Sequence, residues 1–171
     1  MKSYKIIDFT KEEQDLDIYK DVVFVGLFVG RKEQFIKSKI NFIVKKPGTI
    51  AEIFIRAILF DSSRIKLDCN IFVPKGMTKT DAYLQIRVLE LSPYAKTIVT
   101  PALEICENDV KCGHALTISQ PDPIQIDYLK SRGINQAEAI DLISQGFINS
   151  TIDLIEDDKI KLELIKKYSN A

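Results

Sequence analysis

The stretch RIKLDCNIFV, from Arg64 to Val73, alternates apolar and polar side chains without a break. Neighbouring side chains of a β-strand point to opposite faces, so this stretch has one apolar and one polar face. The apolar row consists of Ile65, Leu67, Cys69, Ile71 and Val73, and the polar row of Arg64, Lys66, Asp68 and Asn70. The pattern predicts a half-buried strand whose apolar row points into the core.

Similar patterns occur on both sides of this stretch. They cover residues 23–29, 40–44 and 53–59 upstream, and 83–91, 97–105 and 110–118 downstream. In the first of them, one face is formed by Val23, Val25, Leu27 and Val29. Short strands separated by turns are typical of a β-sandwich, a barrel or a solenoid. Periodicity does not choose among these three, and no strict repeat is visible.

The pattern changes to helical near residue 120. Asp122 and Pro123 are typical of an N-cap and a first helical position, and Gly133 of the residue after a helix. Asn135 and Glu138 have the spacing of a capping box that begins a second helix. Apolar residues at helical spacing follow at Ile140, Ile143 and Phe147, and in the last stretch at Ile160, Leu164 and Ile165. The sequence therefore predicts a β body over 1–120 and a helical segment over 121–171.

Composition restricts the broad class of protein. The chain has 171 residues, with 24 Lys plus Arg and 24 Asp plus Glu, so the formal net charge is zero. That balance gives no overall attraction to nucleic acid or to an anionic membrane. Residues 22–29 are apolar but too few to span a membrane, and residues 1–8 lack the apolar core of a signal peptide. Three cysteines form no dense disulfide framework, so we expect a protein of the reducing cytoplasm.

Few residues suggest chemistry. The sequence contains no glycine-rich phosphate loop and no nucleophile elbow. His114 is the only histidine, and Cys112 lies on the same face of its predicted strand. Thiolates and imidazoles bind zinc, iron and iron–sulfur clusters, but two ligands do not close a metal site. The alternative is that both belong to an apolar row with Val110, Leu116 and Ile118. Cys106 is either a third ligand or another strand residue.

Three blocks of sequence resemble one family. They are NIFVPKGMTKTDAYL from Asn70, TDAYLQIRVLELSPYAKTIVTPALEICENDVKCGHALTISQPD from Thr80, and YLKSRGINQAEAIDLISQGFI from Tyr128. In this order they are similar to the late part of SufB and SufD proteins, whereas residues 1–44 do not align. The resemblance implies a short right-handed parallel β-helix, followed by a C-terminal helical segment. Its inward faces would be the apolar rows named above, stacked on one another.

The resemblance also implies a function. Family members are non-enzymatic scaffold subunits that work with a SufC-type ATPase and a SufB/SufD-type partner to build a transient iron–sulfur cluster. His114 and Cys112 match positions near the cluster at the subunit interface. Gly113 and Ala115 stand where SufB proteins carry acidic residues, which favours a SufD-like chain.

The helical segment would bind the ATPase, through residues predicted to be Ile126, Tyr128, Leu129, Arg132, Ile140 and Phe147. The partner would be a SufB/SufD-type subunit or a second copy of this chain. Two alternatives stay open. One is an interaction module that binds the ATPase but has lost cluster chemistry. The other is a small metal-dependent enzyme that uses Cys106, Cys112 and His114.

Overall fold

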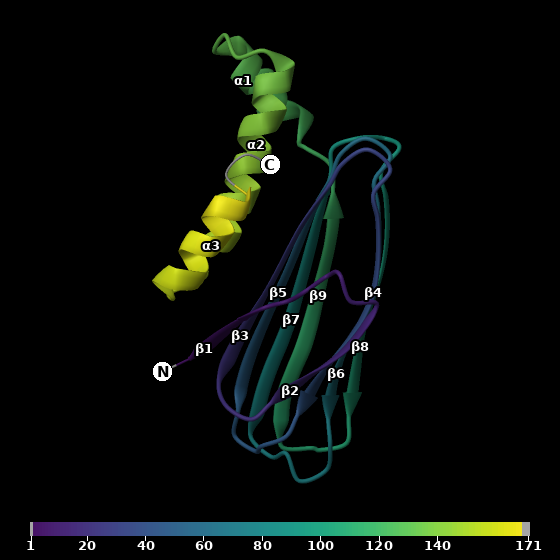
Figure 1. The fold of residues 1–171 in the computed structure, drawn as a ribbon, viewed down its shortest axis with the longest axis vertical. Helices are drawn as coiled ribbons and strands as arrows, with labels where there is room; N and C mark the ends of the chain where they lie inside the picture. Colours follow the sequence, from purple (N-terminus) through teal and green to yellow (C-terminus); the bar gives the residue numbers. More distant parts are fainter. Residues whose placement is uncertain (1, 169–171) are drawn as a thin grey trace.

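The computed structural model describes residues 2–168 and contains nine strands and three helices within that range (Figure 1). The strands are β1 Ser3–Ile6, β2 Glu13–Ile18, β3 Val22–Gly30, β4 Phe35–Val44, β5 Ile50–Leu59, β6 Arg64–Val73, β7 Thr80–Glu90, β8 Lys96–Ile105 and β9 Val110–Ser119. The helices are α1 Pro123–Ser131, α2 Gln136–Ile152 and α3 Asp158–Tyr168.

The strands form a β-solenoid. The odd-numbered strands make a five-stranded sheet in the order β1-β3-β5-β7-β9, and the even-numbered strands make a four-stranded sheet in the order β2-β4-β6-β8. Every strand pair is parallel, so the chain passes from one sheet to the other and back about four times. This arrangement confirms the solenoid among the three predicted β architectures.

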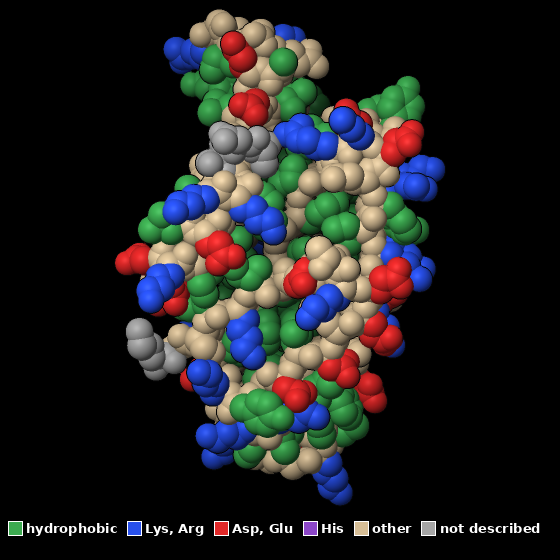
Figure 2. All heavy atoms as spheres, in the orientation of Figure 1, with side chains coloured by type: hydrophobic (Ala, Val, Ile, Leu, Met, Phe, Trp, Pro, Cys, Tyr) green, Lys and Arg blue, Asp and Glu red, His purple; other side chains and the backbone are tan. Residues whose placement is uncertain are grey.

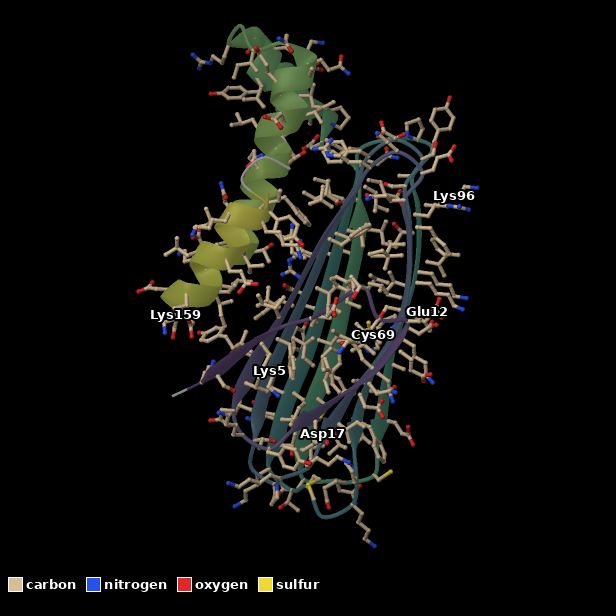
Figure 3. All side chains as sticks on the ribbon, viewed as in Figure 1. Lys5, Glu12, Asp17, Cys69, Lys96 and Lys159 are labelled. Atoms are coloured by element: carbon tan, nitrogen blue, oxygen red, sulfur yellow. The ribbon has the colours of Figure 1, made fainter. Side chains whose placement is uncertain are left out.

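The space between the two sheets is filled by apolar rows in register. Leu67 of β6 lies beside Ser38 of β4 and Val99 of β8. The row predicted from residues 64–73 is buried between the sheets, as are the inward residues of β4 and β5. Figure 3 places Cys69 between the sheets, while Lys96 projects outward from β8. The predicted direction of the β6 side chains is therefore confirmed.

For β3 the predicted direction is wrong. Val23, Val25 and Leu27 are buried, but they face out of the solenoid and form a second core with α2 and α3. The inward row of β3 contains Phe24, which meets the ring of Phe42 edge to face at 5.2 Å. Both faces of β3 are covered, so its sequence is apolar throughout and alternation does not reveal which row is inside.

The first turn of the solenoid consists of two short strands that the sequence pattern does not reveal. The ring of Phe9, between β1 and β2, lies over Gly26 on the inner face of β3. A Cβ at position 26 would be only 2.7 Å from that ring. Glycine at this position therefore lets Phe9 pack close to the backbone of β3.

The helices begin and end as the sequence predicts. Asp122 accepts a hydrogen bond from the backbone N–H of Ile124, and Asn135 and Glu138 form the reciprocal capping box of α2. Gly133 has a φ of 86°, which suits glycine after a helix. Helices α2 and α3 cover the outer face of the five-stranded sheet, and none of the three helices within residues 2–168 lies over the four-stranded sheet (Figure 1). Within residues 2–168, no helix is long and apolar enough to cross a membrane.

Candidate functional site at the open end of the solenoid

Strands β8 and β9 form the last turn of the solenoid, and each is the edge strand of its sheet. We call this turn the open end. Inward residues of the preceding turn are fully buried, whereas Ile105 of β8 is 41% exposed and Ile118 of β9 is 45% exposed. An edge strand also carries backbone N–H and C=O groups that lack a neighbouring strand. The open end is therefore an apolar surface bordered by unpaired strand edges.

His114 lies on this surface. It pairs in register with Leu84 of β7, whose side chain is fully buried, but His114 itself is exposed. Across residues 2–168, the side chain of His114 has no hydrogen bond or ion pair to another residue. Both ring nitrogens are therefore available to accept a metal ion or to exchange a proton. His114 therefore lies outside the packed core, although the alternating apolar row to which it belongs would predict a buried position.

Cys112 lies on the same row, two residues before His114. Its side chain is half-buried and packs against the solenoid core beside Ala82. Burial raises the pKa of the Cys112 thiol, so the neutral thiol is favoured in the free subunit. A bound metal would favour the thiolate instead. Cys112 can therefore act as a ligand when metal binding displaces its proton.

The three-ligand interpretation receives no support from the geometry. Cys106 is exposed at the end of β8, and its backbone N–H donates to the carbonyl oxygen of Val73. Among the residues that the structure describes, no three His, Cys, Asp or Glu side chains are grouped so that they could hold a metal ion. Cys69 lies inside the solenoid, where burial raises its pKa to about 12. A site built on His114 and Cys112 needs further ligands from outside this chain.

Gly113 separates the two candidate ligands and faces the opposite side of the sheet. The ring of Tyr83 lies against it, so that a Cβ at position 113 would be 3.1 Å from Cε2 of Tyr83. An aromatic ring over a glycine of a neighbouring strand fixes the position of that strand. Tyr83 therefore helps to hold the edge strand that carries Cys112 and His114. Sequence reasoning missed this contact because it depends on the register of β7 and β9.

A second candidate surface lies between α1 and α2. It is an apolar groove lined by Ile124, Gln125, Tyr128, Leu129, Leu142 and Ile143. Figure 2 shows hydrophobic side chains on the helical lobe that rises above the β body. Ile124 is 77% exposed, and Tyr128 and Leu142 beside it are also exposed, so the groove is a contiguous apolar patch of the kind that marks an interaction surface.

Only part of the predicted partner-binding set lines this groove. Tyr128 and Leu129 do, and the guanidinium of Arg132 lies 5.3 Å from the centre of the Tyr128 ring. Phe147 instead packs toward the five-stranded sheet, where Arg87 covers its ring at 5.3 Å. Ile126 and Ile140 are half-buried and do not line the groove. The prediction missed Ile124 and Leu142, whose exposure depends on how α1 packs on α2.

Comparisons with known proteins give one consistent family. Residues 17–147 match the model of the family described as "SUF system FeS cluster assembly, SufBD core domain". The iron–sulfur cluster assembly protein SufD of Bacillus subtilis is 32% identical over 162 residues, covering 91% of this chain and 36% of the relative. SufD of Escherichia coli is 32% identical over 112 residues, covering 66% of this chain and 26% of the relative.

A SufBD family protein of Synechocystis sp. is 36% identical over 86 residues, which is 50% of this chain and 19% of that protein. The chain thus spans about a third or less of the length of these relatives. The family model matches well over half of the chain, and its matched residues include β3 to β9 and the candidate site. The match begins at residue 17, so the expectation that residues 1–44 do not align with the family is wrong for residues 17–44. The chain therefore belongs to the SufBD core domain family of SUF system FeS cluster assembly.

Proposed function

We propose that this protein is a non-catalytic scaffold subunit in iron–sulfur cluster assembly, and that a cluster is built as cargo at its open end. One observation carries the proposal: His114 is exposed on an apolar row whose equivalents in the preceding turn are buried. An imidazole in this position has no structural partner among residues 2–168 and is free to bind a metal. Family membership and the SufD relatives give the chemistry to which such a ligand would belong.

The partner at the open end is a SufB/SufD-type subunit or a second copy of this chain. A second solenoid could hydrogen-bond to the free edges of β8 and β9 and so extend both sheets. It would also cover apolar side chains that solvent now reaches, namely Ile105, Leu116 and Ile118. Burying them together would contribute favourably to the free energy of association.

Cluster binding requires that partner. His114 can supply a nitrogen and Cys112 a sulfur, but a cluster or a tetrahedral metal needs about four ligands. The partner would supply the rest. Since burial raises the pKa of Cys112, this thiol would become a ligand only when an iron ion replaces its proton. The free subunit is therefore expected to bind iron poorly.

A SufC-type ATPase would bind the groove between α1 and α2. An exposed apolar groove on a helical lobe fits a partner that inserts apolar side chains between two helices. The most exposed apolar residues there are Ile124, Tyr128 and Leu142. We therefore propose this groove in place of the partner-binding residues predicted from the sequence, which included Phe147, because Phe147 is turned toward the sheet.

A second candidate function is an interaction module that binds the ATPase without cluster chemistry. This function is favoured because His114 and Cys112 supply only two ligands, which do not complete a metal site, and no third ligand is grouped with them among the described residues. The two candidates differ only in what happens at the open end. Both keep the α1–α2 groove as the ATPase-binding surface.

Co-expression with a SufB-type subunit and a SufC-type ATPase, followed by anaerobic reconstitution with ferrous iron and sulfide, tests the proposal. We expect the three chains to co-purify and iron plus sulfide to be retained only by the complex. If iron and sulfide were retained equally well without this chain, the interaction module would be favoured. If this chain co-purified with neither subunit, both functions would be rejected.

The groove is tested separately with the double variant Ile124→Asp, Leu142→Asp. It should lose the ATPase, because two charges would be buried at the contact. The matched control is Leu162→Asp, which places a charge at an exposed apolar residue of α3 outside the groove. Equal loss of the ATPase in both variants would show that the groove is not the binding surface.

A further inference from the structure

The outer face of the four-stranded sheet carries a compact group of positive charges. Phe35, Arg64 and Lys96 are paired in register on β4, β6 and β8, and two residues further along the strands Lys37, Lys66 and Ile98 are paired in the same way. We call Lys37, Arg64, Lys66 and Lys96 the basic block. Adjacent strands are about 4.8 Å apart, and successive outward residues of one strand about 6.6 Å apart, so the four charges share a small area.

The register of the sheet sets like charges directly opposite each other. Lys37 lies opposite Lys66, and Arg64 lies opposite Lys96. Like charges at directly opposed positions destabilise a sheet. Over residues 2–168, none of the four forms an ion pair. The repulsion within these cross-strand pairs opposes folding, and a partner that neutralises the charges would relieve it.

Apolar side chains accompany the charges. Phe35 is 52% exposed and Ile98 is 58% exposed, and they occupy diagonal corners of the same two rows. Arg64 covers one face of the Phe35 ring, with its guanidinium 5.1 Å from the ring centre. Arginine and aromatic side chains are enriched at protein-binding surfaces, and the Arg64–Phe35 pair is of this kind. Neither helix that covers the five-stranded sheet reaches this face (Figure 1).

The acidic side chains of β2, on the same face, are already engaged by neighbouring residues of the chain. Glu13 and Asp17 of β2 form ion pairs with Lys39 and Lys45, and Asp15 accepts a hydrogen bond from Asn41. Asp68 follows the basic block on β6 in the row of Lys39. The hydrogen bond from Lys39 to Glu13 is the main cause that raises the pKa of Lys39, and Asp68 adds to it. The acids of β2 are therefore already engaged within the chain, which favours a different molecule as the source of the negative charge.

We propose that the basic block, with Phe35 and Ile98, is a docking surface for a protein partner that presents clustered Asp and Glu side chains. A nucleic acid is a less suitable partner for two reasons. The chain has zero net charge and so exerts no overall attraction on it, and Arg64 covers one face of the Phe35 ring on which a base could stack. Lys96 and Ile98 lie on β8, so this surface borders the open end, whereas none of its residues lines the α1–α2 groove.

The test uses the full chain and a short fluorescein-labelled peptide that alternates glutamate with serine, with binding followed by fluorescence anisotropy at low and high salt. The variant Lys37→Gln, Arg64→Gln, Lys66→Gln, Lys96→Gln should bind at least about tenfold more weakly than the unmodified chain at low salt. The matched control Lys20→Gln, Lys46→Gln, Lys75→Gln, Lys79→Gln removes four exposed charges from turns at the other ends of the strands. It should change the affinity by less than about threefold.

Thermal unfolding of the same variants distinguishes a binding role from a structural one. Because the block places like charges opposite each other, its neutralisation should leave the melting temperature unchanged or raise it. A lower melting temperature, or equal weakening of peptide binding by the control variant, would overturn the proposal. It would also be overturned if a single-stranded oligonucleotide of equal charge bound the unmodified chain as tightly as the peptide does.

Discussion

The phenolic hydroxyl of Tyr168 donates a 2.6 Å hydrogen bond to the backbone carbonyl oxygen of Leu27, which lies 141 positions earlier in the chain. The bond joins the end of α3 to β3, on the outer face of the five-stranded sheet. Burial raises the pKa of Tyr168, so the hydroxyl keeps the proton that it donates. Tyr168 thereby attaches the helical segment to β3, whereas the covalent connection follows β9 at the edge of the same sheet.

Tyr168→Phe should lower the free energy of unfolding by about 0.5–1.5 kcal/mol, because it removes one hydrogen bond and keeps the ring. Denaturant unfolding followed by circular dichroism measures the change. Tyr94→Phe is the control, since Tyr94 is largely exposed and its hydroxyl forms no bond with the described residues. A Tyr168→Phe chain as stable as the control would mean that α3 is held by apolar contacts alone.

Leu67→Ala should lower the free energy of unfolding by about 2–5 kcal/mol, because the shortened side chain leaves a cavity between two closely packed sheets. Leu67 is fully buried in the middle of the solenoid core. Ile98→Ala on the outer face of the same sheet removes a similar volume and should cost far less. If both variants lost the same stability, the assignment of inner and outer faces would be wrong.

Gly113→Val should destabilise the protein by about 1 kcal/mol, because the new side chain meets the ring of Tyr83. In a Tyr83→Ala background the ring is absent, and the same substitution should cost less. A double-mutant cycle by thermal unfolding measures this coupling. Additive effects of the two substitutions would show that the ring does not hold the edge strand.

Stability at high pH should depend on Cys69. Its pKa is raised from 9.0 to about 12 in the folded chain, and the cause is burial. Below about pH 9 the thiol is protonated in both states, whereas above it the unfolded chain releases the proton that the folded chain keeps. The free energy of unfolding should therefore fall as pH rises from 9 toward 12, by up to about 1.4 kcal/mol per pH unit from this group.

Denaturant unfolding at several pH values measures that slope. Cys69→Ala should reduce it, and Cys106→Ala should leave it unchanged because Cys106 is exposed. A slope that is the same in all three chains would mean that other groups cause the alkaline loss of stability.

The strands were predictable wherever one face of a strand is buried and the other is exposed to solvent. The row from Ile65 to Val73 satisfies this condition, and its alternation gave both the strand and its direction. Strand β3 does not satisfy it, because α2 and α3 cover its second face. Strands β1 and β2 were missed because they are short, and β2 carries acidic residues outward at Glu13, Asp15 and Asp17.

The candidate site was predictable only in part, because two of its features depend on how distant strands and helices meet. The alternation placed Cys112 and His114 on one face, but the exposure of that face follows from the position of β9 as an edge strand. The α1–α2 groove depends on the packing of two helices, which turns Phe147 inward and leaves Ile124 exposed. The basic block depends on cross-strand register, which a single sequence does not contain.

The central claim is that His114 serves cluster assembly at the open end and has no role in holding the fold. The most direct measurement compares His114→Ala with the unmodified chain for thermal stability and for iron and sulfide retained by the complex with a SufB-type subunit and a SufC-type ATPase. Lys111→Ala, a surface change on the same strand, is the control. We expect a nearly unchanged melting temperature, with iron and sulfide retention clearly reduced only for His114→Ala. Normal retention, or a loss that parallels unfolding, would contradict it.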